Sequence, residues 1–334
     1  MKTDLTFNDM ATEEGQMTTV DVSSLKKLPV DFREFPWKTY TDAQKNEFCC
    51  LLDDVVALQI PVPKTPEEEE EIVNKFLEGV RKLFTPENNW TCLAMLDTSM
   101  EYCAQCNSCP EACHLFEATN GHDMYRPNFR SELFRRIYKQ YVKKEPLAKW
   151  RYGDTLLNWR TVVRLAELAY RCNLCRRCAQ VCPIGVDNGL IARELRKLFS
   201  QELGWHPREL HEKGTMLQLE AGSSTGMTPA VDIETVEFID EDYVESTGYE
   251  FKTPWDVEGA DILLLHNAGE MLAWPDNIAA FSIIFEAAGL SWTLSSEIAG
   301  YDSVNYGIFY DDVQAARVAL KHAEAAKKLG VKQI

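Results

Sequence analysis

Cysteine is the residue type that could carry chemistry in this chain of 334 residues, because eight of its eleven cysteines form two runs of the same spacing. Each run reads C-x2-C-x2-C-x3-C, the spacing of [4Fe–4S] sites in bacterial two-cluster proteins. A tight loop with two-residue gaps can place three thiolates at three corners of an iron–sulfur cube, and the fourth thiolate must come from elsewhere. The first run is Cys103, Cys106, Cys109 and Cys113, and the second is Cys172, Cys175, Cys178 and Cys182, followed by Pro183.

In two-cluster proteins the fourth cysteine of each run ligates the other cluster. We therefore predict two [4Fe–4S] clusters with crossed ligands. Structural zinc is the alternative, but zinc sites usually pair two C-x2-C knuckles, and a three-knuckle run fits them poorly. The predicted ligands are Cys103, Cys106, Cys109 and Cys182 for cluster 1, and Cys172, Cys175, Cys178 and Cys113 for cluster 2.

The remaining candidate groups are weaker. His114 stands where a proline often follows the fourth cysteine; it could donate a hydrogen bond to a cluster sulfur, but we interpret it as a turn residue. Cys49, Cys50 and Cys92 lie outside the runs and are interpreted as buried apolar thiols. We find no phosphate-binding glycine motif, no flavin or nicotinamide site and no nucleophile–base pair. The sequence therefore shows no active site of its own and leaves open whether the chain is an enzyme.

Composition limits the possible partners. The net charge of −17 argues against nonspecific binding to nucleic acid. No apolar run approaches the roughly 20 residues of a membrane-spanning helix, and the polar, acidic start argues against secretion. We expect a cytoplasmic location, or one at the inner face of the cell membrane through a complex. Between Arg126 and Arg177, however, fourteen Lys/Arg stand against four Asp/Glu. This segment is either a solvated helical face, or a region that neutralises buried anionic clusters or docks an acidic partner.

Apolar residues at helical spacing predict the elements that must position the two runs. Thr65 as N-cap and Pro66 at the first helical position are a strong helix start. Asp154 is expected to cap the helix that leads into the second run. The expected helices cover residues 41–58, 65–84, 129–143, 154–170 and 190–204.

The pattern changes after residue 213. Residues 214–257 are rich in small and acidic residues and are interpreted as a linker. Short apolar strands at 261–266 and 292–294 then alternate with helices at 278–288 and 311–329, which predicts a parallel α/β unit. The chain ends as a further strand begins at Val331, so we expect this unit to be incomplete. The predicted domains are a helical region at 1–90, a cluster domain at 91–213, the linker at 214–257 and an α/β domain at 258–334.

The distance between the runs suggests a family. Two predicted helices separate Cys113 from Cys172, whereas the runs of compact β-rich ferredoxins lie much closer together. The chain in this respect resembles the α-helical ferredoxin domain of succinate dehydrogenase and glycerol-3-phosphate dehydrogenase iron–sulfur subunits, and of heterodisulfide reductase subunits C and D. The resemblance implies a mainly α protein, in which an α-helical ferredoxin domain precedes a smaller α/β domain.

From Asp261 onward the chain resembles the first cysteine-rich (CCG) domain of heterodisulfide-reductase-type proteins. These include the DsrK-like subunit of sulfate reducers' membrane redox complexes and the glycolate oxidase iron–sulfur subunit. Ala268 and Ala299-Gly300-Tyr301 stand where the family has cysteines. The resemblance therefore implies a degenerate CCG domain that binds no cluster through these positions.

The function that the resemblance implies is that of an electron-transfer iron–sulfur subunit of an oxidoreductase complex. Two [4Fe–4S] clusters would relay electrons between a quinone-linked membrane subunit or a cytochrome b and a cysteine-rich, CCG-domain catalytic partner. One alternative is the iron–sulfur subunit of a flavin-linked dehydrogenase for glycolate, lactate or glycerol 3-phosphate, with a flavoprotein as partner. Another alternative is a structural metal protein without a redox role.

Overall fold

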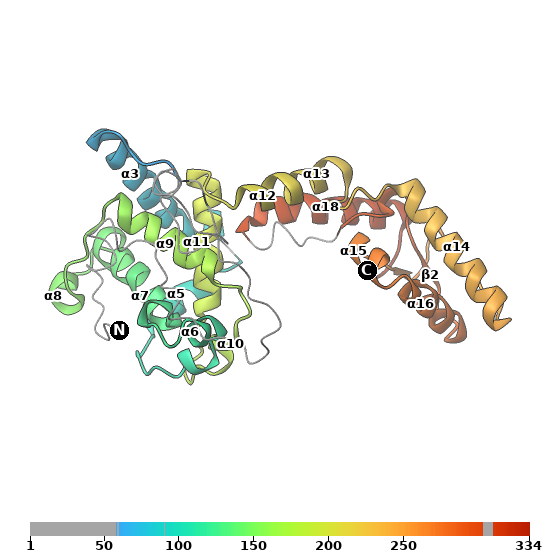
Figure 1. Ribbon diagram of the computed structural model, residues 1–334, viewed down its shortest axis with the longest axis horizontal. Helices are drawn as coiled ribbons and strands as arrows, with labels where there is room; N and C mark the ends of the chain where they lie inside the picture. Colours follow the sequence, from blue (N-terminus) through green and yellow to red (C-terminus); the bar gives the residue numbers. More distant parts are fainter. Residues whose placement is uncertain (1–57, 59, 90, 303–309) are drawn as a thin grey trace, which may run out of the picture. The chain divides into compact units, whose positions relative to one another are not determined.

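Helices make up nearly all of the regular structure, as the sequence predicts (Figure 1). The computed structural model describes residues 58, 60–89, 91–302 and 310–334. The predicted helix at 41–58, apart from Leu58, lies outside these residues, as do Cys49 and Cys50. The chain divides into two units, Met1–Arg208 and Glu209–Ile334, and each is described by itself.

The first unit contains the two cysteine runs among short and long helices. Its predicted helix starts and ends are largely confirmed, although a π-helical turn, η5, continues α7. The elements are α3 (Pro66–Leu83), α4 (Pro86–Asn89), α5 (Leu93–Glu101), η3 (Pro110–Ala112), α6 (His114–Ala118), η4 (Asp123–Tyr125), α7 (Pro127–Ile137), η5 (Tyr138–Val142), α8 (Ala148–Tyr152), α9 (Trp159–Arg171), α10 (Arg177–Gln180) and α11 (Asn188–Leu203).

Helices α3, α7, α9 and α11 pack together and form the core of this unit. Each contributes apolar residues at helical spacing that are fully or almost fully buried, and the rings of Phe76 in α3 and Phe199 in α11 stack at 5.9 Å. Burial of such side chains contributes about 1.5–3 kcal/mol each. The core therefore holds α7, α9 and α11 in place, and these are the helices that border the cysteine runs.

Of the two N-caps predicted from the sequence, one is confirmed and one is wrong. Thr65 caps α3 as predicted, because its hydroxyl oxygen accepts a hydrogen bond from the backbone N–H of Glu68 at 3.3 Å. The prediction that Asp154 caps α9 is wrong. Asn158 is the N-cap, and its side-chain oxygen accepts from the Thr161 N–H at 2.9 Å. Asp154 instead forms an exposed ion pair with Lys149 at 3.0 Å.

The second unit contains the predicted parallel pairing. Strand β1 (Ile262–Leu263) pairs in parallel with β2 (Trp292–Thr293), with Ile262 opposite Trp292. A parallel bridge between Ile262 and Gln333 marks the further strand expected near the end of the chain. The helices and turns of this unit are α12 (Arg208–Leu210), η6 (His211–Met216), α13 (Leu217–Ala221), α14 (Pro229–Thr247), α15 (Ala268–Ala273), α16 (Asp276–Ala287), η7 (Ser296–Ile298) and α18 (Asp312–Leu329).

The segment interpreted as a linker contains α14, a helix of 19 residues. Its N-cap Thr228 is followed by Pro229, and its C-cap is Gly248 in the left-handed conformation, which are recognised helix signals. Val236 and Ile239 of α14 belong to the core cluster that includes Ile278 of α16. Residues 229–247 are therefore part of the second unit and not a connection outside it.

Candidate [4Fe–4S] site

The two cysteine runs adopt the same local backbone. Gln105 and Asn107 flank the second cysteine of the first run, and Leu174 and Arg176 occupy the same places in the second; all four have φ between +54° and +61°. Left-handed conformations cost energy for residues with a side chain. Their repetition at equivalent positions shows that both spacings produce one loop shape, with three cysteines on a tight turn.

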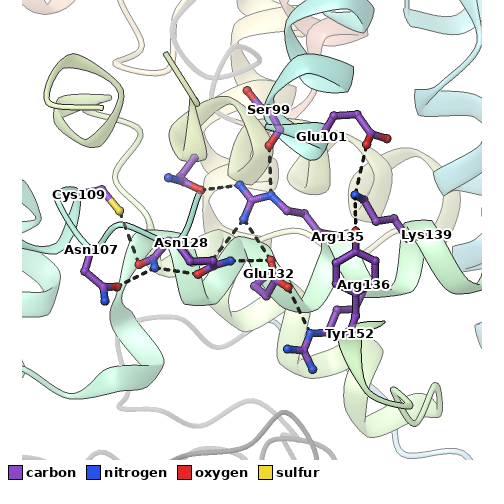
Figure 2. Close-up of polar contacts among 12 residues, drawn as sticks. Ser99, Glu101, Asn107, Cys109, Asn128, Glu132, Arg135, Arg136, Lys139 and Tyr152 are labelled. Carbon is purple, nitrogen blue, oxygen red and sulfur yellow. Dashed lines mark hydrogen bonds and ion pairs between the residues drawn. The ribbon is translucent and has the colours of Figure 1, made fainter. Parts of the chain in front are cut away.

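The first run is held by Asn128 near the start of α7 (Figure 2). The Asn128 amide nitrogen donates to the side-chain oxygens of Gln105 at 3.1 Å and Asn107 at 2.9 Å. Its side-chain oxygen lies 3.6 Å from the Cys109 sulfur and accepts from that thiol. Gln105 also donates to Glu132, one turn further along α7, at 2.8 Å. One buried helix therefore holds both left-handed residues of the loop and one of its cysteines.

Burial and hydrogen bonds act differently on the thiols of the runs. Desolvation raises the pKa of Cys109 and raises that of Cys178 to about 12. The Ser108 hydroxyl lowers the pKa of the exposed Cys106. The ligands of iron are thiolates. The free thiols of the two runs stand in for these thiolates. The buried thiols of Cys109 and Cys178 need a positive partner such as iron to lose their protons.

The second run leads into the N-terminus of α11. The carboxylate of Asp187, the N-cap of this helix, accepts from the Leu190 N–H at 2.9 Å and from the left-handed Arg176 at 2.7 Å. The Val186 N–H donates to the Cys182 sulfur at 3.2 Å. The chain after Cys178 is therefore tied back onto its own loop through the helix cap.

The two runs meet in space through residues that lie 59 positions apart in the sequence. His114, directly after the first run, lies 3.2 Å through its Nε2 from the side-chain nitrogen of Asn173, directly after Cys172. The short turn η3 between Cys109 and Cys113 also packs against α10, which carries Cys178. The exposed His114, interpreted from the sequence as a turn residue, is the first residue of α6.

The surroundings of Arg130 indicate whether an anionic cluster fits this site. Its guanidinium is buried, and the Nε and Nη1 atoms have no hydrogen-bond partner in the described part of the protein. Its Nη2 lies 3.8 Å from the Cys113 sulfur, and its charge lowers the pKa of Cys178. A buried cation with unused donors is costly unless an anion lies beside it. The residues present therefore fit a thiolate-bound [4Fe–4S] cluster, whose overall charge is negative.

Arg135 connects the supports of the two runs, at the centre of Figure 2. This buried side chain donates to the Ser99 carbonyl oxygen in α5 at 3.1 Å, to the Asn128 carbonyl oxygen at 3.4 Å and to the Asn188 side-chain oxygen at 3.1 Å. Asn128 holds the first run, and Asn188 begins α11 directly after Asp187. The sequence marks Arg135 only as a member of the basic segment 126–177.

The basic segment is divided by the fold. Arg130, Arg135, Lys139 and Arg164 are buried, whereas Lys149 and Arg151 are exposed. Only Arg130 among the buried ones contacts a cysteine in the described part of the chain. The exposed residues agree with the interpretation as a solvated face, whereas the neutralisation of anionic clusters by the buried ones stays a prediction.

The complete ligand sets stay a prediction. In the described residues, no three His, Cys, Asp or Glu side chains converge as a site for a metal ion. Cys92 is buried, as predicted, and its thiol lies 3.5 Å from an Arg193 nitrogen. Asn128 and Asp187 were not predicted, and Arg130 and Arg135 were predicted only as members of the basic segment, because only folding brings these residues to the runs.

In the second unit, the positions that resemble the CCG cysteines follow the two strands. Ala268 is buried at the start of α15, after β1. Ala299 and Gly300 follow β2 and line a cavity with His266 and Asp232. Gly300 has φ +71°, and a Cβ there would come within 2.7 Å of Met227. Ala268, Ala299 and Gly300 themselves offer no side-chain ligand atom for a metal.

Comparisons with known proteins agree with this chemistry. Residues 99–186, which include all eight predicted ligands, match the family model of the 4Fe-4S dicluster domain. The chain is 28% identical over 280 residues to the Hdr-like menaquinol oxidoreductase iron-sulfur subunit 2 of Archaeoglobus fulgidus, which covers 80% of this chain and 47% of that protein. It is 26% identical over 252 residues to the Hdr-like menaquinol oxidoreductase iron-sulfur subunit of Archaeoglobus profundus, covering 70% and 42%.

The chain thus spans less than half the length of each of these relatives. No solved structure matches it. The family match confirms the prediction that the cysteine runs belong to a [4Fe–4S] domain and not to a zinc domain.

Proposed function

Since this chain is similar to heterodisulfide-reductase-like iron–sulfur subunits and carries a [4Fe–4S] domain, we propose that it transfers electrons through two clusters within a larger oxidoreductase complex. Each cluster supplies one-electron redox chemistry when it is bound. Cys103, Cys106, Cys109 and Cys182 would hold the first, and Cys172, Cys175, Cys178 and Cys113 the second.

The observation that carries this proposal is the meeting of the two runs. Electron exchange between clusters requires that they lie close together, and crossed ligands require that each loop reach the other. The contact between His114 and Asn173 and the packing of η3 against α10 support both requirements. The buried, unsatisfied Arg130 supports an anionic group beside Cys113 and Cys178.

The names of the relatives suggest the partners. Those proteins are named as subunits of menaquinol oxidoreductases. We propose that this chain relays electrons between a quinone-linked or cytochrome membrane subunit and a cysteine-rich catalytic partner. None of the described helices is both long and apolar enough to cross a lipid bilayer. Contact with the inner face of the membrane would therefore come through a partner subunit.

Iron and acid-labile sulfide analysis of anaerobically prepared protein tests the cofactors. Two clusters predict about eight irons and eight sulfides per chain, with electron paramagnetic resonance (EPR) signals that appear on reduction. Cys106→Ser should alter the first cluster and Cys175→Ser the second, whereas Cys92→Ser, outside both runs, should leave both intact. Bound zinc, or an equal effect of Cys92→Ser, would contradict the proposal.

The crossed ligands have their own test. Cys182→Ser should change the same EPR signal as Cys106→Ser, and Cys113→Ser the same signal as Cys175→Ser. If each substitution instead affected the cluster of its own run, the crossed ligand sets would be wrong while two clusters remained.

Anaerobic purification of the complex from its native source tests the relay. We expect a cytochrome or quinone-linked subunit to co-purify and the clusters to be reduced by a quinol. Co-purified flavin, with reduction by glycolate, lactate or glycerol 3-phosphate, would instead support a flavin-linked dehydrogenase. Clusters that neither a quinol nor these substrates reduce would contradict electron transfer by this route.

A further inference from the structure

The two candidate cluster sites differ in the charge of their surroundings. At the second site, the Arg130 Nη2 lies 3.8 Å from Cys113, and no described carboxylate forms an ion pair with this arginine. Most buried arginines of the unit use their donors on oxygen atoms, as Arg135 and Arg164 do. Arg130 therefore differs from them, because its charge is not matched by the protein.

Arg196 in α11 adds a second cation at this site. It donates to the backbone carbonyl oxygens of Ala169, Tyr170 and Cys172, and its burial keeps water away from them. Because its donors are used by the backbone, Arg196 fixes the start of the second run and contributes charge there. Asp187, whose charge acts on Cys178, already pairs with Arg176 at 2.6 Å.

Neutral groups make the described side-chain contacts with the predicted ligands of the first site. The described side-chain contacts of its predicted ligands are the Ser108 hydroxyl with Cys106 and the Asn128 amide with Cys109. Cys182 accepts from a backbone N–H. Among the described residues, the arginines that contact predicted ligands, Arg130 and Arg196, both do so at the second site.

Building on the proposed function, we propose that Arg130 is an electrostatic partner of the second cluster and makes it the cluster of higher reduction potential. A reduced cluster carries one more negative charge than an oxidised cluster. A fixed, buried cation beside the cluster stabilises the reduced form more than a neutral amide does. An electron shared between the two clusters then resides mainly on the one held by Cys113, Cys172, Cys175 and Cys178.

Potentiometric titration followed by EPR tests this asymmetry. The signals of the two clusters are first assigned with Cys106→Ser and Cys175→Ser. In the unsubstituted protein the second cluster should be reduced first. In Arg130→Gln the midpoint potential of the second cluster should fall by about 59 mV. For a one-electron couple, this shifts the distribution of an electron between the two clusters about tenfold toward the first cluster. Arg130→Lys, which keeps the charge, should restore most of this difference.

The matched control is Arg126→Gln, which removes a charge just before α7 from a guanidinium paired with Asp123 at 2.6 Å. It should leave both midpoints unchanged. Protein labelled with 15N-arginine gives a second test that needs no neutral variant. Hyperfine spectroscopy of the reduced second cluster should detect a guanidinium nitrogen whose coupling disappears in Arg130→Lys.

The possible failures are distinguishable. Arg130→Gln protein with eight irons and unchanged midpoints, or with equal shifts of both clusters, would overturn the role of Arg130 and leave the electron-transfer proposal intact. Absence of the 15N coupling would also overturn it. Protein that binds no iron–sulfur cluster even without substitutions would instead refute the proposed function.

Discussion

A buried arginine is stable in a protein only when its donors or its charge find partners. Arg135 finds carbonyl and amide oxygens from three helices, and Arg164 finds Glu167 at 3.0 Å. Arg130 finds sulfur. The same residue type thus has three different roles within one basic segment, and the role is decided by the atoms that surround each guanidinium.

Replacing Arg135 should destabilise the first unit. Arg135→Met leaves the Ser99 and Asn128 carbonyls and the Asn188 side chain without their donor, at a cost of about 3 kcal/mol. For a unit of this size that lowers the melting temperature by roughly 6–12 °C, measurable by circular dichroism under anaerobic conditions. Arg151→Met removes an exposed arginine and should change the melting temperature by less than about 2 °C. Equal shifts would contradict the bridging role.

A half-buried histidine should make the second unit sensitive to acid. Burial lowers the pKa of His322 below its ordinary 6.5. The unfolded chain therefore takes up a proton first as the pH falls, so this contribution to stability is complete above pH 6.5 and is lost below it. We expect His322→Gln to flatten the decline in melting temperature between pH 7.5 and 5.5, whereas the exposed His114→Gln should not. An unchanged slope in His322→Gln would refute this.

At the scale of elements, the close contact of α3 with α11 shows how helices outside the runs position them. α11 begins at the cap that binds the second run, and its later turns pack on α3. Gly79 of α3 is buried where a Cβ would lie 2.8 Å from the Leu198 Cγ and 2.9 Å from the Glu202 Cγ. Lys82 pairs with Glu202 at 2.7 Å beside this contact.

Gly79→Ala should therefore destabilise the protein although alanine favours helix. Helix propensity would gain up to about 1 kcal/mol, but separating two packed helices costs typically 1–3 kcal/mol. We expect a net loss of about 1 kcal/mol in a denaturant titration. Glu78→Ala, on the exposed side of the same turn, should be close to neutral. Stabilisation by Gly79→Ala would show that α3 and α11 can separate without cost.

At the scale of the whole molecule, the chain has two units, and only the first contains the predicted cluster ligands. All eight predicted ligands lie in the unit that ends at Arg208, and the unit from Glu209 onward has its own core clusters. Similarity to heterodisulfide-reductase-type iron–sulfur subunits, expected from the sequence, is confirmed by the relatives. We expect loss of the clusters to affect the units unequally.

Removal of iron should loosen the first unit alone, because metal binding and folding are coupled at thiolate sites. After anaerobic chelation, hydrogen exchange should accelerate in both cysteine runs and at the start of α11. Amides of α14, α16 and α18 should keep their protection. Equal acceleration in both units would indicate that the second unit depends on the clusters, and no change in the first would indicate that its fold does not need them.

Local signals in the sequence were sufficient to predict the [4Fe–4S] domain, most helices and the parallel pairing of the strands. Thr65 with Pro66, Gly204 and the alternation after Asp261 each act over a few residues, so short-range physics suffices to interpret them. The cap of α9 was misplaced because Asp154 and Asn158 are both good caps, and packing selects one of them. Helix α14 was overlooked although Thr228-Pro229 and Gly248 are the same kinds of signal.

Only the tertiary structure decided which polar residues serve the cysteines. Asn128 reaches Cys109 across 19 residues, Arg130 reaches Cys113 across 17, and Arg135 reaches Asn188 across 53. Spacing along the chain determines which cysteines can share a loop, because a loop is a local object. Which cation lies beside a thiolate depends on how separate helices pack, and that follows from the burial of their apolar faces.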